Sequence, residues 1–215
     1  MSILFAEGFT LGIGLLIALG PKDTFVIKNS LGGQHALILV LICALSDVLL
    51  IVLGVLGLGT LISTSHGVMV IAMMLSIAYL VYYGVMALRA AIVGMQSLEL
   101  HGLDAEHAMP RRRVITEALF HSLLTPYAWL DTVLVIGAIS STKAGLGKWW
   151  FASGAILASF LWFMFLTRGA RVAAPLFRSR RAWRMLDAIV AVSMLALAIK
   201  LLGDYPWQTL AATPE

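Results

Sequence analysis

Six long apolar runs, separated by shorter polar segments, dominate the 215-residue chain. An α-helix needs about 20 apolar residues to cross the roughly 30 Å hydrocarbon core of a bilayer. The pattern therefore predicts an all-α polytopic membrane protein with six transmembrane helices. Their approximate ranges are 5–30, 36–62, 68–91, 114–139, 149–167 and 185–202. The second range is long for a vertical span, which indicates a tilted helix or an interfacial end.

The composition supports lipid as the solvent of this chain. Hydrophobic residues make up 60% and charged residues 12%, against about 25% charge in soluble domains. The formal charge of +4 does not indicate a nucleic-acid partner, because the arginines cluster between the apolar runs. Cys43 is alone in an apolar run, so the chain forms no internal disulfide and signals no cysteine-based metal site. We expect a lipid bilayer as partner, and neither a metal nor a cofactor.

The basic residues predict the orientation of the chain. Eleven of the fifteen lie after the first, third or fifth apolar run, and three lie on the opposite side or near the last helix end. Because short cytoplasmic loops are enriched in Lys and Arg, both termini are expected outside the cytoplasm. The polar stretch of residues 94–113 is then a cytoplasmic linker between two halves, at about 1–93 and 114–203, of a single transmembrane domain.

Prolines interrupt the first and the fourth run. Pro21 is followed by Asp23-Thr24 and Pro126 by Asp131-Thr132. With three helices per half, the fourth helix crosses in the direction opposite to the first, so a duplication would be an inverted repeat. Proline removes a backbone N–H and frees a carbonyl one turn earlier. Paired broken helices in two such halves indicate a transporter site, and two ordinary proline kinks are the alternative.

Two aspartates, Asp47 and Asp131, lie inside apolar runs. A carboxylate at the centre of a bilayer helix costs about 2.5–3.5 kcal/mol on insertion scales, so it normally faces a partner, a cavity or a transported species. We expect a site near the bilayer midplane, between the first, second and fourth helices. There, Asp47 and Asp131 would hold a substrate amino group or exchange a proton, and backbone N–H groups near Pro21 and Pro126 would bind a substrate carboxylate.

Five segments in order, GPKDTFVI, LICALSDVLLI, YLVYYG, PYAWLDTVLVIG and WWFASGAILASFLWF, carry a more specific pattern. Together they resemble the lysine/arginine exporter (LysE-type) family of bacterial inner membranes. The matching positions are Gly20, Pro21, Phe25, Ser46, Asp47, Tyr83, Gly84, Pro126, Leu130, Asp131, Thr132, Phe160, Leu161 and Trp162.

The resemblance implies a secondary transporter rather than an enzyme. It would export an amino acid, most often a basic one such as L-lysine or L-arginine, driven by a proton gradient or the membrane potential. The partners would be the amino acid and protons or another coupling ion, and a homo-oligomer is left open. The candidate substrate-binding and proton-coupling residues are Pro21, Lys22, Asp23, Ser46, Asp47, Tyr83, Pro126, Asp131 and Thr132.

This chain departs from the family pattern at three places. Lys22-Asp23 stands where the family usually has Gln-Asn, Thr125 stands where Asn precedes the proline, and His121 replaces an apolar residue. We predict that Lys22 and Asp23 form a local ion pair in non-helical backbone at the first break. If Lys22 instead points into the site, it would bind a substrate carboxylate, and the substrate would be a neutral or acidic amino acid or a related small metabolite.

Two rival classes are a membrane-embedded enzyme and a passive channel. Asp47 and Asp131 could imitate an aspartyl protease pair, but the flanking motifs differ and no HExxH motif occurs.

Glycines in the first two runs predict close helix packing through small-residue faces. The two predicted faces consist of Gly8, Gly12 and Gly14, and of Gly54, Gly57 and Gly59.

Overall fold

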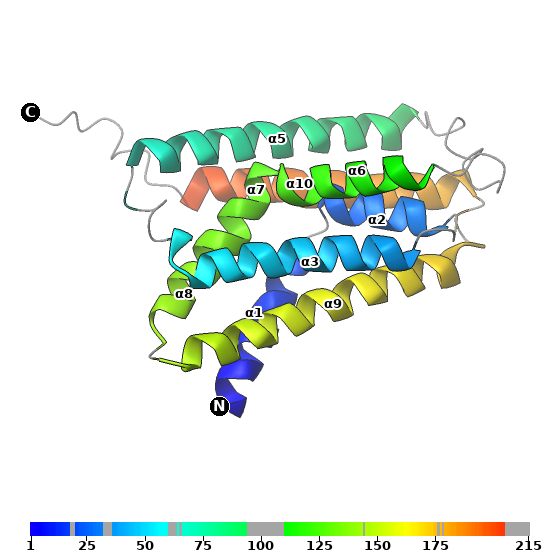
Figure 1. The fold of residues 1–215 in the computed structure, drawn as a ribbon. Coiled ribbons are helices and arrows are strands. Elements are labelled where there is room, and N and C mark those ends of the chain that lie inside the picture. Colours follow the sequence, from blue (N-terminus) through cyan, green and yellow to red (C-terminus); the bar gives the residue numbers. More distant parts are fainter. Residues whose placement is uncertain are drawn as a thin grey trace, which may run out of the picture.

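The described part of the chain consists of helices joined by short turns, without strands (Figure 1). The computed structural model describes residues 1–17, 20–31, 36–59, 64, 66–93, 110–143, 145–175, 177 and 179–204. The helices are α1 (Ser2–Leu16), α2 (Pro21–Leu31), α3 (Ala36–Val55), α5 (His66–Val93), α6 (Arg111–Leu123), α7 (Pro126–Ala128), the π-helix η4 (Trp129–Ile136), α8 (Gly137–Ser141), α9 (Gly147–Ala173) and α10 (Arg180–Asp204).

Four helices, α3, α5, α9 and α10, are long and apolar enough to cross a membrane. Two bent pairs raise the number of spans to as many as six: α1 with α2, bent by 80°, and α6 with the segment 126–141, bent by 51°. Large apolar side chains cover the outside, such as Leu37 at 75% and Phe165 at 67% exposed. Such a surface is unfavourable in water and suits helices that cross a membrane. The predicted all-α, multi-pass membrane class is therefore confirmed.

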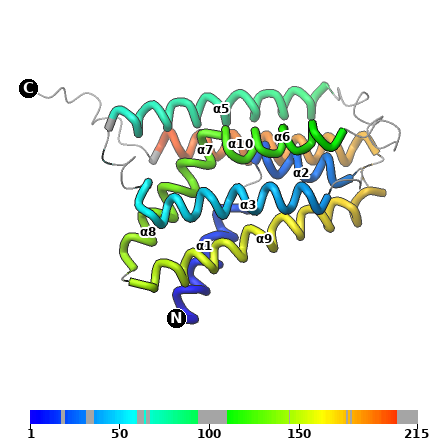
Figure 2. Tube along the Cα trace, in the orientation of Figure 1, coloured from blue at the N-terminus to red at the C-terminus, as the bar shows by residue number. Residues whose placement is uncertain are grey.

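Figure 2 follows the chain through a layered bundle in which helices of the two halves alternate. The first segment of each half packs on the second candidate span of the other: α1 lies against α9, and α6 lies against α3. The third helices, α5 and α10, pack against each other. The main core lies between α2, α3, α5, α9 and α10, around buried residues such as Cys43, Leu80, Phe163 and Met194.

The second predicted helix is too long by several residues. It was expected to reach residue 62, but α3 ends at Val55. Gly57 follows with a backbone φ of +100°, a conformation that glycine adopts without steric penalty and that commonly ends helices. The helix therefore ends in a turn at residues 56–57, and residues 60–62 of the predicted range lie outside the described residues.

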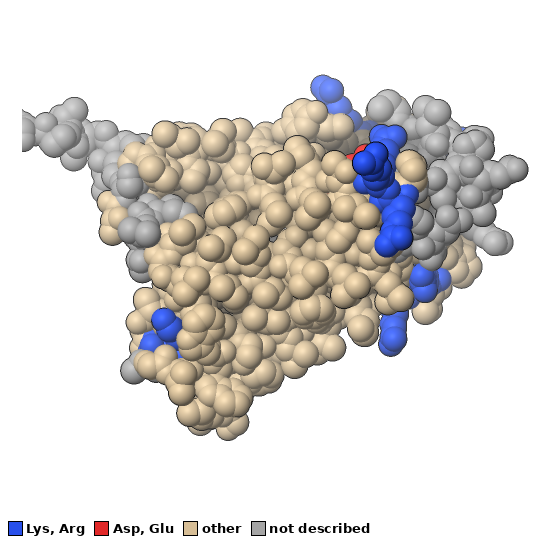
Figure 3. Space-filling model, in the orientation of Figure 1, with Lys and Arg blue, Asp and Glu red and all other residues tan. Residues whose placement is uncertain are grey.

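Most of the basic residues assigned to loops belong to helix ends instead. Arg89 lies four residues before the end of α5, Arg111 begins α6, Arg171 lies in the last turn of α9 and Arg180 begins α10. Figure 3 shows Lys and Arg gathered at one end of the visible face, with a smaller group at the opposite end. Long basic side chains at helix ends reach the interface while their stems stay in apolar surroundings. The linker residues 94–109 and Arg178 lie outside the described residues.

Glycines bring two helix pairs into backbone contact. A Cβ added at Gly8 would lie 2.0 Å from the carbonyl oxygen of Phe151, and one at Gly154 would lie 2.1 Å from that of Phe5, so α1 and α9 touch through their backbones. Similarly, a Cβ at Gly59 would lie 2.4 Å from the carbonyl oxygen of Val133. Gly54 lies at the same contact, between α3 and η4.

The predicted faces are wrong at two positions. Gly14 has no atom within 4 Å of its Cβ position, and Gly57 forms the turn after α3. Gly12 does belong to the α1–α9 contact, where a Cβ would lie 2.9 Å from Cβ of Ala158.

Gly8→Ala is expected to destabilise the protein, whereas Gly14→Ala is expected to be neutral. The added methyl group at Gly8 meets backbone that cannot rotate away, and overpacking of this kind costs about 1–3 kcal/mol or more. Thermal unfolding in detergent measures the difference, with Gly14→Ala as the matched control on the same helix. Equal melting temperatures for the two variants would contradict the α1–α9 contact.

Candidate functional site

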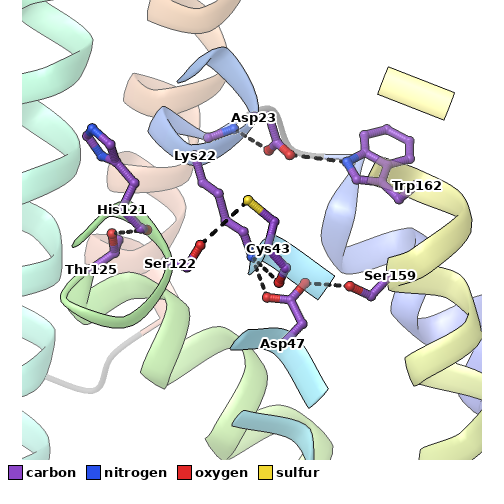
Figure 4. A network of polar contacts seen from close by, with 10 residues as sticks. Lys22, Asp23, Cys43, Asp47, His121, Ser122, Thr125, Ser159 and Trp162 are labelled. Atoms are coloured by element: carbon purple, nitrogen blue, oxygen red, sulfur yellow. Dashed lines mark hydrogen bonds and ion pairs between the residues drawn. The ribbon is translucent and has the colours of Figure 1, made fainter. Parts of the chain in front are cut away.

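An ion pair between Lys22 of α2 and Asp47 of α3 lies at the centre of the polar network in Figure 4. The Lys22 Nζ atom is bonded to Asp47 Oδ1, lies 3.4 Å from the backbone carbonyl oxygen of Cys43, and lies 4.5 Å from the centroid of the Phe163 ring. The other carboxylate oxygen, Asp47 Oδ2, accepts a hydrogen bond from Ser159 Oγ at 2.6 Å. Asp47 is only 7% exposed. The network therefore holds a largely buried ammonium and a buried carboxylate as each other's counter-ions.

The predicted Lys22–Asp23 ion pair is wrong. Helix α2 begins at Pro21, so Lys22 and Asp23 are consecutive helical residues whose side chains point about 100° apart. Asp23 Oδ2 accepts the backbone N–H of Gly20 at 2.9 Å, and Asp23 Oδ1 accepts Nε1–H of Trp162 at 3.2 Å. Asp23 therefore caps its own helix by reaching back to the residue before it, as the third residue of a capping box does.

The Asp23 cap occupies a backbone group at the first break that a substrate could otherwise bind. Backbone N–H groups near Pro21 were expected to bind a substrate carboxylate, but the N–H of Gly20 is bonded to Asp23. The Gly20 carbonyl is also used, since it accepts the N–H of Thr24 at 3.0 Å and the Thr24 hydroxyl at 3.0 Å. These polar groups at the first break are satisfied within the protein.

The second break, at Thr125-Pro126, is also stabilised by side chains. Thr125 Oγ1 donates to the carbonyl oxygen of His121 at 2.6 Å, and Trp129 Nε1–H donates to that of Leu123 at 2.7 Å. A proline ring disfavours the helical backbone conformation of the residue before it. Thr125 accordingly has an extended backbone, with φ −82° and ψ 111°. The predicted break at Pro126 is therefore confirmed as a bend whose nearby carbonyls have side-chain donors.

Asp131 and Thr132 lie half-buried on η4, an eight-residue π-helical segment directly after the second break. π-helical segments are rare and frequently occur at functional sites. The contact of Gly54 and Gly59 with Val133 presses this segment against the end of α3. Asp47 lies seven residues before Gly54, about 10 Å along the helix from this contact, so α3 and η4 each carry one carboxylate.

Tyr83 and His121 belong to a separate aromatic cluster between α5 and α6. The Tyr83 ring centroid lies 4.5 Å from that of Tyr79 and 6.1 Å from that of His121, and the Tyr79 hydroxyl lies 3.3 Å from Thr125 Oγ1. His121 packs 5.3 Å from Phe25, and its buried Nδ1 atom has no hydrogen-bond partner among the described residues. The predicted residue Ser46 is buried on α3 next to Asp47 in the chain.

Four residues of the network were not predicted as site residues: Cys43, Ser159, Trp162 and Phe163. The last three occupy positions i, i+3 and i+4 of α9, which share one helix face. This spacing was a usable signal, because it places a hydroxyl, an indole N–H and an aromatic ring side by side within an apolar run. The part of Cys43 that binds Lys22 is its backbone carbonyl, which sequence patterns do not reveal. In the described ranges, no three His, Cys, Asp or Glu side chains gather as metal ligands.

Two proline-broken helices that meet at buried charged residues within a bundle of apolar helices are typical of a polytopic membrane transport protein. The family model described as LysE type translocator matches residues 13–204, so this chain belongs to that family and is a multi-pass inner-membrane protein.

The sequence similarity to known proteins extends over almost the whole chain. The chain is 34% identical over 197 residues, which are 92% of each chain, to the arginine exporter protein ArgO of Salmonella paratyphi A (strain ATCC 9150 / SARB42). The same identity and coverage hold for ArgO of Salmonella enteritidis PT4 and of Salmonella typhimurium strain LT2. No solved structure matches this chain.

Proposed function

We propose that this protein exports a basic amino acid, L-arginine or L-lysine, across the inner membrane, driven by the proton gradient or the membrane potential. Membership of the translocator family and the names of the ArgO relatives support amino-acid export. The observation that carries the choice of a cationic substrate is the charge at the breaks. The three carboxylates Asp23, Asp47 and Asp131 outnumber the ammonium of Lys22, even when Lys200 of α10 is counted as a second cation that interacts with Asp131. This excess of negative charge favours a cation near them.

The transport cycle is proposed to use two inverted halves that expose the site alternately to each side of the membrane. The reciprocal packing of α1 on α9 and of α6 on α3 supports this symmetry, because the first segment of each half packs against a helix of the other half. Asp131 and Asp47 would bind the substrate cation or exchange a proton. The half-buried position of Asp131 on η4 suits a group that must be reached by substrate or water.

The alternative of a neutral or acidic substrate required Lys22 to point into an open site. Its ammonium instead faces Asp47, Cys43 and Phe163, so it offers less positive charge to a substrate carboxylate. The enzyme alternative, an aspartyl pair of Asp47 and Asp131, gains no support because Asp47 is bonded to Lys22 and Ser159.

Efflux from proteoliposomes tests the proposal. Vesicles loaded with radiolabelled L-arginine, L-lysine, L-leucine or L-glutamate are diluted with and without an imposed proton gradient or potential. Saturable, gradient-dependent efflux of arginine or lysine is the expected result. Gradient-driven efflux of leucine or glutamate alone would contradict the substrate class, and flux that does not saturate would indicate a channel.

The proposed orientation, with both termini outside the cytoplasm, is tested by cysteine labelling. In a Cys43→Ser background, Arg112→Cys and Arg180→Cys lie at the basic end of the bundle, and Ser141→Cys lies in the last turn before Lys143. A membrane-impermeant thiol reagent applied to intact cells should label Ser141→Cys only. The two other variants should react only after the cells are opened. External labelling of Arg112→Cys or Arg180→Cys would reverse the orientation.

A further inference from the structure

The groups that surround Lys22 Nζ form a complete receptor for a primary ammonium. An ammonium carries three N–H donors and no acceptor. Around Nζ lie a carboxylate oxygen of Asp47, the carbonyl oxygen of Cys43 at 3.4 Å, and the face of the Phe163 ring at 4.5 Å. An aromatic face attracts a cation within about 6 Å of its centroid. Each donor of the ammonium therefore has an acceptor at hand.

The receptor does not depend on α2, the helix that carries Lys22. Asp47 and Cys43 lie on α3, one helical turn apart, and Phe163 lies on α9. Ser159 of α9 donates to the second oxygen of Asp47 and so fixes the carboxylate from the side opposite to Lys22. Only the ammonium comes from α2, next to Pro21 at the break in the first run. The receptor would thus remain if the lysine side chain were shortened.

The shape of the receptor favours an ammonium over a guanidinium. Arginine binds a carboxylate best through two parallel N–H···O bonds that use both oxygens. At Asp47, one oxygen is already engaged by Ser159, which leaves one oxygen for the cation. An ammonium group, with its compact charge and three independent N–H donors, fits this geometry better than a planar guanidinium group.

We propose that Lys22 is a tethered ligand that fills a primary-ammonium site built by Asp47, Cys43 and Phe163, and that the ammonium group of a transported molecule competes with it for this site. The inference rests on the proposed function only for the second part, the competition. Lys22, which stands where the family usually has Gln, is then a specificity-determining residue. A short tether gives an effective concentration on the order of mM, so Lys22 raises the substrate concentration needed to occupy Asp47.

A binding experiment without transport tests the site itself. The Lys22→Ala variant in detergent is melted in n-butylammonium chloride, which replaces the lost side chain, and in tetramethylammonium chloride, which has the same charge but no N–H donor. We expect butylammonium to raise the melting temperature of Lys22→Ala above that in tetramethylammonium. No such difference is expected for the wild type or for Lys22→Ala/Asp47→Asn. Equal effects of the two salts on Lys22→Ala would overturn the proposal.

A second background covers the case in which Lys22→Ala fails to fold. Lys22→Gln, with the residue usual in the family, is melted in methylammonium, which needs less space, against tetramethylammonium. A selective stabilisation that disappears in Lys22→Gln/Asp47→Asn supports the site. Its absence in folded Lys22→Gln counts against the site.

Transport kinetics test the competition. If Lys22 leaves the site free for one tenth of the time, the apparent affinity of a competing cation is about tenfold weaker than its intrinsic affinity. Lys22→Gln should then lower the half-saturating concentration of L-lysine by about this factor. An unchanged value for lysine would refute the competition. Lack of lysine and arginine flux in every variant would contradict the proposed function, while the melting experiment would still decide whether the ammonium site exists.

Discussion

Asp131→Asn is expected to reduce gradient-driven efflux of basic amino acids to the level of protein-free vesicles. Asparagine keeps the shape of the side chain, but it loses the charge that would attract a cation and the proton that would be exchanged. Because Asp131 is half-buried on the π-helix η4, the variant is expected to insert and fold normally. Efflux of radiolabelled arginine and lysine from proteoliposomes, with equal amounts of inserted protein, measures the effect.

The matched control is Glu117→Gln. Glu117 is a carboxylate of α6 that pairs with Arg113 at 2.8 Å, near the basic end of the bundle. Exposed pairs four residues apart on a helix contribute only about 0.3–0.5 kcal/mol. This variant should export at the wild-type rate. Normal efflux by Asp131→Asn would show that Asp131 serves packing or hydrogen bonding and would remove it from the proposed mechanism.

Asp47→Asn is expected to destabilise the protein strongly, and a second substitution at Lys22 is expected to restore much of the loss. Removing one partner of a buried ion pair leaves an uncompensated charge, at a cost of about 3–5 kcal/mol. Replacing both charges, as in Lys22→Gln/Asp47→Asn, removes that penalty. Asp47 is thus expected to stabilise the fold as well as to serve transport, because it is the counter-ion of Lys22.

Unfolding in detergent of the wild type, the two single variants and the double variant completes a double-mutant cycle. A coupling energy of several kcal/mol is expected for Lys22 and Asp47, against less than about 1 kcal/mol for the exposed pair Arg113–Glu117. If the double variant is no more stable than Asp47→Asn, the two residues are not each other's counter-ions. Efflux by the double variant then shows whether the Asp47 charge is needed for transport once the fold is intact.

Hydropathy alone predicted the helices of this chain well, because crossing lipid is a local requirement on about 20 consecutive residues. The breaks at Pro21 and Pro126 were equally predictable, since proline cannot continue the backbone hydrogen bonding of a helix. The family could be recognised for a similar reason: its pattern consists of short segments in a constant order, from GPKDTFVI to the run that contains Trp162. Where a helix ended at a glycine turn, as α3 does before Gly57, the apolar pattern continued and the prediction ran too far.

Which side chains meet was decided only by the tertiary structure. Asp23 follows Lys22 by one residue and Asp47 follows it by twenty-five. Lys22 pairs with the distant Asp47, because the side chains of adjacent residues of α2 point in different directions around the helix axis. Gly8 and Gly14 look alike in the sequence, yet only Gly8 faces another backbone, since α9 crosses one side of α1. Sequence therefore determined the depth and order of the polar residues through local energetics. Their partners followed from helix crossing and rotation, which depend on contacts between segments more than 100 residues apart, such as Asp47 and Ser159.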